Sequence, residues 1–90
     1  MSIEIYIHTS QVELTDGLEV VEVDGKTVSE CLDHLIEHFP GMEKGLFKKK
    51  GELHPFVEIY INLETVYPDE LNKPVKDGDK IHIILMLAGG

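Results

Sequence analysis

The chain has 90 residues, 42% of them hydrophobic, and 17 acidic residues against 8 lysines give it a net charge of −9. This length allows one domain with a single core, and the composition excludes a disordered chain. No apolar run reaches the ~20 residues that span a bilayer, and the acidic excess repels phosphate backbones and anionic membranes. We therefore expect neither nucleic acid nor a membrane among its partners.

The start of the chain and its cysteine content bear on where it works. Residues 1–6 have neither the basic region nor the cleavage site of a secretory signal. The single cysteine, Cys31, has no partner for an internal disulfide, which fits a reducing compartment. We expect a cytoplasmic protein. Its acidity fits either a protein partner with a basic docking surface or plain solubility.

The first third of the chain predicts two strands. Isoleucines alternate with polar residues over 3–8, the pattern of a half-buried strand, and a turn at 15–17 leads into a second strand over 18–23. The apolar residues change parity inside this second strand. We expect either a bulge near Val20 and Val21 or a strand that is covered on both sides.

A capped helix follows. Thr27 and Glu30 have the spacing of a capping box, in which the two side chains satisfy free amides of the first helical turn. Pro40 and Gly41 end the helix, 42–47 predicts another short helical turn, and 48–51 a solvated lysine loop. One face of the main helix is apolar, through Val28, Leu32, Leu35, Ile36 and Phe39.

The remaining segments complete a sheet. Residues 56–61 alternate as a strand, 65–67 make a short extended piece, 72–79 are a loop, and a last strand begins at Lys80. A single helix is the natural crossover between parallel neighbours, so the first and last strands can lie side by side. We predict an α+β fold, a ubiquitin-like β-grasp with a mixed four- to five-stranded sheet and one main helix on one face. Residues 1–90 would form a single domain.

The last strand predicts an exposed apolar patch. Alternation directs Ile81, Ile83, Leu85 and Leu87 toward the helix, so the intervening side chains point to the other face. By parity, five side chains would gather there as a partner-binding surface: Tyr6, Phe56, Tyr60, Ile84 and Met86. Alternatively, residues 9–17 or Leu63 fold over this face.

The sequence runs from this apolar strand into Ala88, Gly89 and Gly90. Glycine has no Cβ, so two of them make a thin tip that can enter a narrow channel. We predict that 88–90 project as a flexible tail and that the Gly90 carboxylate is the reactive group. An accidental ending is the plainer alternative.

One cluster could be interpreted as a metal site. Cys31, His34 and His38 share a helical stripe, but zinc usually takes four ligands, and no recognised ligand motif accompanies these three. The alternative assigns Cys31 to the edge of the core and leaves the histidines solvated. We find no nucleotide loop and no Ser-His-Asp set, so the sequence predicts a non-catalytic chain without a bound metal.

Together these features resemble the MoaD/ThiS family of ubiquitin-like sulfur carriers. The resemblance covers almost the whole chain. It rests on the capped helix from Thr27, the strand and turn over 56–62, the Asp-Gly-Asp turn over 75–80, and the apolar strand that ends in Ala-Gly-Gly.

The resemblance implies a function located in the tail. An adenylating enzyme would activate the Gly90 carboxylate with ATP, and a sulfur donor would convert it to a thiocarboxylate, with Gly89 part of the motif. The chain would bind no cofactor itself. Its partners would be the adenylating and sulfur-transferring enzyme and a sulfur-accepting synthase subunit, which would also contact Leu87 and Ala88. The free protein would be a monomer.

The resemblance leaves the acceptor open. The length and the stretch over 54–57 look like the longer molybdopterin-synthase small subunits and the carriers of cysteine synthesis. Met86 and Leu87 stand where molybdopterin-type chains commonly carry a proline. A second class remains possible, a ubiquitin-like protein modifier or binding module that acts through the open sheet face.

Overall fold

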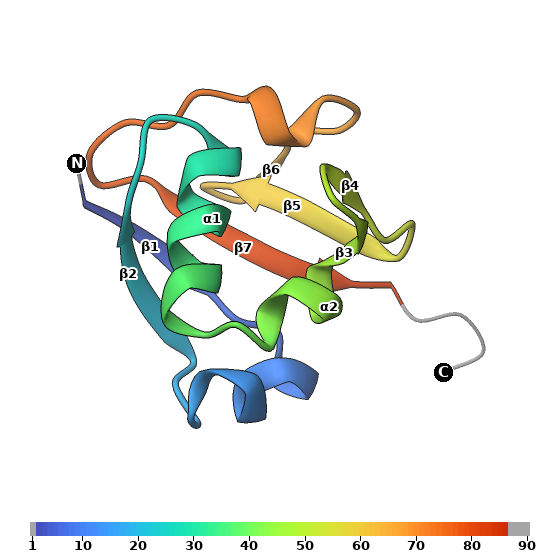
Figure 1. The fold of residues 1–90 in the computed structure, drawn as a ribbon. Coiled ribbons are helices and arrows are strands. Elements are labelled where there is room, and N and C mark those ends of the chain that lie inside the picture. The colour runs from blue at the N-terminus through green and yellow to red at the C-terminus, as the bar shows by residue number, and fades with distance from the viewer. Residues whose placement is uncertain (1, 87–90) are drawn as a thin grey trace.

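The computed structural model describes residues 2–86 and shows a sheet with one main helix lying across it (Figure 1). The main sheet has five strands in the order β2-β1-β7-β5-β6, and β3 and β4 form a separate hairpin. The strands are β1 Ser2–Tyr6, β2 Val20–Asp24, β3 Phe47–Lys49, β4 Glu52–Leu53, β5 Val57–Ile61, β6 Glu64–Thr65 and β7 Lys80–Leu85. The helices are η1 Thr9–Thr15, α1 Val28–His38, α2 Met42–Leu46 and η2 Glu70–Asn72.

The first and last strands are parallel neighbours in the centre, as predicted. β1 pairs with β7 from Glu4 opposite Lys80 to Tyr6 opposite His82. On its other edge β7 pairs antiparallel with the whole of β5, from Val57 opposite Leu85 to Ile61 opposite Ile81. This topology, with one helix across the sheet, confirms the predicted β-grasp fold.

The predicted bulge in the second strand is wrong. β2 pairs with β1 in an unbroken register, from Asp24 opposite Ser2 to Val20 opposite Tyr6. Val21 points into the core, whereas Val20 is 39% exposed. The parity change in the sequence arises because Leu18 precedes the strand and is itself exposed. The bulge was predicted because Leu18 was counted as part of the strand.

Helix α1 begins at the predicted cap. The Thr27 hydroxyl accepts a hydrogen bond from the Glu30 amide at 3.2 Å, and the Glu30 carboxylate accepts one from the Lys26 amide at 2.8 Å. The predicted apolar face lies on the sheet, with Ile36 and Phe39 partly buried. Its fully buried residues are Val28, Cys31, Leu32 and Leu35. Cys31 therefore belongs to the core and not to its edge.

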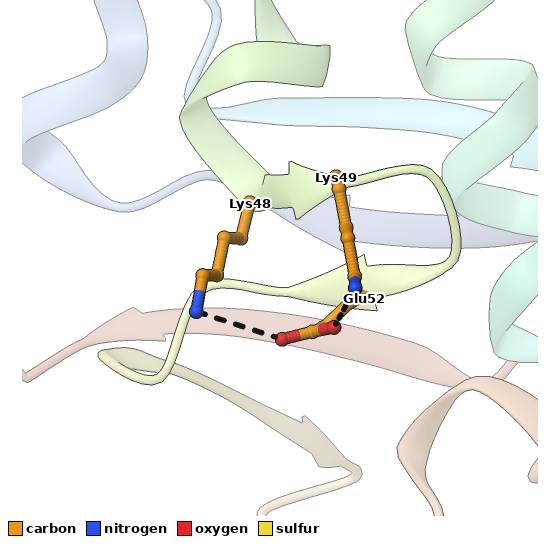
Figure 2. A network of polar contacts seen from close by, with 3 residues as sticks. All are labelled: Lys48, Lys49 and Glu52. Atoms are coloured by element: carbon orange, nitrogen blue, oxygen red, sulfur yellow. Dashed lines mark ion pairs between the residues drawn. The ribbon is translucent and has the colours of Figure 1, made fainter.

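Two segments predicted as loops have regular structure. Residues 9–15 form a 3₁₀ helix that packs on α2, where the buried Gln11 amide group donates to the Gly45 carbonyl at 2.8 Å. The lysine segment forms part of the β3–β4 hairpin. Figure 2 shows Lys48 and Lys49 reaching the same Glu52 carboxylate, at 3.9 and 3.5 Å. β3 has only three residues, which are too few for an alternating pattern to distinguish the strand from a solvated loop.

A polar pair holds the start of β7. The side-chain amide of Asn62 donates to Asp79 at 2.8 Å, and its oxygen accepts from the Lys80 amide at 3.0 Å. Asn62 has a positive φ of 51°, a conformation that asparagine tolerates better than most residues. Burial by itself raises the pKa of Asp79, but hydrogen bonds from Lys76 and Asn62 and the Lys76 charge outweigh it, so the pKa lies below its usual value. The pair thus fixes where the central strand begins.

Across residues 2–86, no helix has the length and apolar character that crossing a membrane requires.

Candidate functional site

The strand that leads to the carboxyl end is the central strand of the sheet. β7 has a strand on each side, and Ile81 and Ile83 are buried beneath α1. Its last described residue, Met86, still donates its amide to the Phe56 carbonyl at 2.7 Å. The chain is therefore held by sheet hydrogen bonds up to Met86.

The residues predicted to carry the chemistry lie outside the described residues. These are Gly90 and Gly89, together with Ala88 and Leu87, which were predicted to contact partners. The structure does define the strand that precedes these residues in the sequence and the sheet face beside it.

The face of the sheet opposite α1 carries an aromatic row. Tyr6 of β1 and Tyr60 of β5 both lie opposite His82 of the central strand. The Tyr6 and His82 rings stack with centroids 4.5 Å apart and planes at 16°. Strand alternation places all three side chains on this face, which fixes its centre.

Apolar side chains extend this row toward the carboxyl end of β7. Ile84 is half-buried, and Met86 is 58% exposed. Phe56 lies beside Met86 through the backbone hydrogen bond and stacks on His54 with centroids 4.7 Å apart. Phe56 packs against the core, and the His54 ring on which it stacks contacts the Lys44 carbonyl of α2, so its side chain is directed to the helix side. We call Tyr6, Tyr60, His82, Ile84 and Met86 the docking face. Strand alternation thus places four of the five predicted surface residues on one side of the sheet, and Phe56 is not among them.

Neither predicted cover lies over the docking face. Residues 9–15 are bound to α2 through Gln11 and Gly45. Leu63, in the turn between β5 and β6, is 76% exposed. Within residues 2–86, the alternative that these segments bury Ile84 and Met86 is therefore wrong.

Sequence reasoning missed His82 and the acidic border of the docking face. Glu4 and Glu22 lie opposite each other on β1 and β2, and Glu58 lies opposite Ile84. The Tyr6 hydroxyl donates to the Glu4 carboxylate at 3.1 Å. Part of the signal was available, because Glu4, Glu58 and His82 have the parity of Tyr6, Tyr60 and Ile84 in their own strands. Glu22 is placed there by its pairing with Glu4. A basic partner surface would complement this border.

The three residues of the metal hypothesis do not share a site. Cys31 is fully buried, and burial, followed by the nearby Glu30 and Asp24 carboxylates, raises the pKa of its thiol to about 11. His34 Nδ1 accepts a hydrogen bond from the Asp24 amide at 2.8 Å, and His38 Nδ1 lies 3.1 Å from the His34 carbonyl oxygen. The described part of the chain contains no group of three or more His, Cys, Asp or Glu side chains suited to a metal ion.

The fold and the docking face together define the class of protein. A mixed five-stranded sheet, one main helix on one face and a central last strand are the features of a ubiquitin-like β-grasp protein. The other face remains available for partners.

Comparison with known proteins narrows this class to a family. The sequence model of the ThiS family matches residues 5–90, which is nearly the whole chain. The sulfur carrier protein CysO of Mycobacterium tuberculosis is 31% identical over 93 residues, covering 100% of both chains. The chain belongs to the ThiS family. The predicted recognition and the predicted carrier class, as opposed to an enzyme, are thereby confirmed.

Solved structures agree with the fold. The crystal structure of the BexX/CysO complex of Amycolatopsis orientalis matches with a TM-score of 0.88 and 35% identity, covering 98% of this chain and 99% of that one. SAMP1 of Haloferax volcanii matches with a TM-score of 0.85 and 27% identity over 100% of both chains. The Amycolatopsis structure contains such a carrier in complex with another protein.

Proposed function

We propose that this protein is a sulfur carrier whose Gly90 carboxylate is adenylated and then converted to a thiocarboxylate. The ThiS family match, which extends to residue 90, is the observation that carries the proposal. The relatives named as sulfur carriers span this chain from end to end. The central, doubly paired β7 gives the tail a fixed base from which to enter a partner's active site.

The proposed reaction has two steps. A Gly90 carboxylate oxygen attacks the α-phosphorus of ATP, and pyrophosphate leaves. A sulfide equivalent then attacks the carbonyl carbon of the acyl-adenylate, and AMP leaves with its bonding electrons. Gly89 and Gly90 offer no side chain to obstruct the channel where both steps occur. ATP belongs to the partner enzyme, and the carrier itself holds no cofactor.

The docking face would guide the tail to its partners. Its apolar centre, around Ile84 and Met86, provides area to bury, and its tyrosines are residue types enriched at interfaces. The partners we propose are the adenylating and sulfur-transferring enzyme and a sulfur-accepting synthase. The free carrier would be a cytoplasmic monomer, in the compartment that supplies ATP and reduced sulfur.

We assign the acceptor to cysteine synthesis. CysO proteins match this chain over its full length, at 31% identity to the mycobacterial protein and 35% to the Amycolatopsis one. A molybdopterin-converting factor complex from Helicobacter pylori matches at 22% identity and a TM-score of 0.60, which supports the fold alone. The acceptor would then be an activated amino acid that receives the thiocarboxylate sulfur.

Intact-protein mass spectrometry tests the carrier function. The protein is incubated with ATP, a sulfide source and the activating enzyme taken from the genome of origin. We expect the mass increase of one sulfur-for-oxygen exchange, dependent on ATP and absent when Gly90 is deleted. As a positive control, the same enzyme is shown to adenylate another carrier of this family. If that control succeeds and the mass of this protein is unchanged, the proposal is refuted.

A second function has its own support. A structure of the small archaeal modifier protein 1 of Haloferax volcanii matches with a TM-score of 0.83 and 25% identity, covering 96% of this chain. A modifier would join its Gly90 carboxylate to a lysine amine of another protein. Recovery from cells of adducts with an isopeptide bond at Gly90 would establish this role, and their absence under sulfur-replete and sulfur-starved growth would exclude it.

A further inference from the structure

β2 is an edge strand of the main sheet, with β1 on one side and, in the described part of the chain, no strand on the other (Figure 1). Its pairing with β1 fixes which backbone groups face outward. The Ile7 amide donates to the Glu19 carbonyl at 2.8 Å, just before β2 begins. Hydrogen-bonded pairs occur at every second residue of an antiparallel ladder, so Val20 and Glu22 turn their amides and carbonyls away from β1.

The Asp24 amide confirms this direction. It lies two residues beyond Glu22, and it donates to His34 Nδ1 of α1 at 2.8 Å instead of to β1. His34 thus closes the far end of the edge. Among residues 2–86, the amides and carbonyls of Val20 and Glu22 have no hydrogen-bond partner, and both residues are exposed. These four backbone groups form a run to which an extended peptide adds as a strand.

The side chains of this edge indicate an apolar residue at one position of the added strand. Val21 and Val23 are buried in the core, so Val20 and Glu22 emerge on the face of the sheet opposite α1. Val20 is 39% exposed, and Leu18, just before the strand, is 48% exposed. An apolar side chain opposite Val20 would remove this exposed surface from water.

The charges indicate a cation at the next position on the same face. Glu22 lies directly opposite Glu4 of β1, and like charges so placed destabilise a sheet. Lys80 of β7 flanks Glu4 on its other side, whereas in the described chain no strand lies on the outer side of Glu22. A lysine or arginine opposite Glu22 would balance these two carboxylates. A second copy of this chain would not, because its own β2 would bring another Glu22 to the same face.

We infer that the outer edge of β2 binds an extended segment of a protein partner in which a lysine or arginine stands two residues from an apolar residue. The cation lies opposite Glu22 and the apolar side chain opposite Val20, since residues two apart in a strand share a face. Such binding goes beyond the proposed function, because it requires neither ATP nor sulfur. β1 separates this edge from β7, so the added segment leaves the central strand uncovered.

The test uses the full chain and a defined probe. A heptapeptide with one lysine and one valine two positions apart, among threonines, is titrated into ¹⁵N-labelled protein. We expect amide shifts concentrated in 19–24, slower hydrogen exchange at the Val20 and Glu22 amides, and affinity that falls with added salt. Shifts confined to Tyr60, Ile84 and Met86, or equal binding when glutamate replaces the lysine, would overturn the inference.

Matched variants separate the edge from the general acidity of the chain. Val20→Pro removes one outward-facing donor at the first residue of an edge strand, where proline is tolerated, and Val20→Ile keeps that donor. Glu22→Gln removes the edge charge, and Glu37→Gln removes an exposed charge on α1. We expect Val20→Pro and Glu22→Gln each to weaken peptide binding about threefold to tenfold, and their controls to change it less than about twofold. Equal effects within either pair would overturn the inference.

A backbone-modified probe tests strand addition itself, and it stays decisive if Val20→Pro does not fold. Methylating alternate amide nitrogens of the peptide removes the donors that face a sheet edge but keeps the lysine charge. We expect one of the two methylation registers to abolish binding and the other to preserve it, and equal binding of both would overturn strand addition. Because all of these measurements omit ATP and the activating enzyme, they can succeed where thiocarboxylate formation fails, and the reverse.

Discussion

The rings of Tyr6 and His82 stack 4.5 Å apart across the two central parallel strands. Tyr60 lies opposite the same histidine from the antiparallel side. The docking face is thus centred on the strand that leads to the carboxyl end. A partner that covers it would contact the strand from which residues 87–90 follow in the sequence.

Replacing Met86 by glutamate tests the docking face. Met86 is 58% exposed, so a charge there should leave the fold intact while opposing burial against a partner. We expect kcat/KM for thiocarboxylate formation to fall at least about tenfold, with the melting temperature nearly unchanged. Leu63→Glu is the control, since Leu63 is 76% exposed but lies in the β5–β6 turn. An equal loss in both variants would argue against a localised docking face.

Cys31 should take no part in sulfur transfer. Its thiol is buried, and with a pKa raised to about 11 almost none of it is thiolate at neutral pH. We expect iodoacetamide to modify it only after urea unfolds the chain. A folded Cys31→Ala variant should acquire sulfur as the wild type does. If it did not, Cys31 would be a sulfur-bearing residue and the tail mechanism would be incomplete.

The Asp79 carboxylate should make stability depend on pH. Because its pKa is lowered in the folded protein, its contribution is fully present above the ordinary value near 3.8 and is lost as the pH falls through the folded pKa. Asp79→Asn turns an NH₂ group toward the Lys76 or Asn62 donor, which should lower the free energy of unfolding by about 1–3 kcal/mol at neutral pH.

Urea unfolding at neutral and strongly acidic pH measures this effect. The difference between wild type and Asp79→Asn should shrink at acidic pH, where the wild-type carboxylate is also protonated. Asp33→Asn, on the exposed side of α1, should change stability by less than about 0.5 kcal/mol at either pH. A difference for Asp79→Asn that is independent of pH would contradict a role for the charge.

Periodicity was enough to predict most of the fold. The alternation over 3–8 and 81–86, the Thr27 cap and the single helix together led to the β-grasp topology, because few other arrangements bury these faces. It failed where an element is short or irregular. The two-residue β4 and the 3₁₀ turn at 9–15 depend on tertiary contacts such as Gln11 with Gly45, which leave no periodic signal.

Some constraints come from packing alone. A Cβ at Gly25, between β2 and α1, would come within 2.9 Å of both the amide nitrogen and the sulfur of Cys31.

The most direct test of the central claim is to locate the transferred sulfur. The protein is loaded with ATP, its activating enzyme and sulfide, and then fragmented in the mass spectrometer. We predict that the sulfur-for-oxygen exchange is found only in carboxyl-terminal fragments that contain Gly90. Sulfur on a fragment that contains Cys31 but not the tail, or loading that persists after Gly90 is deleted, would contradict the account.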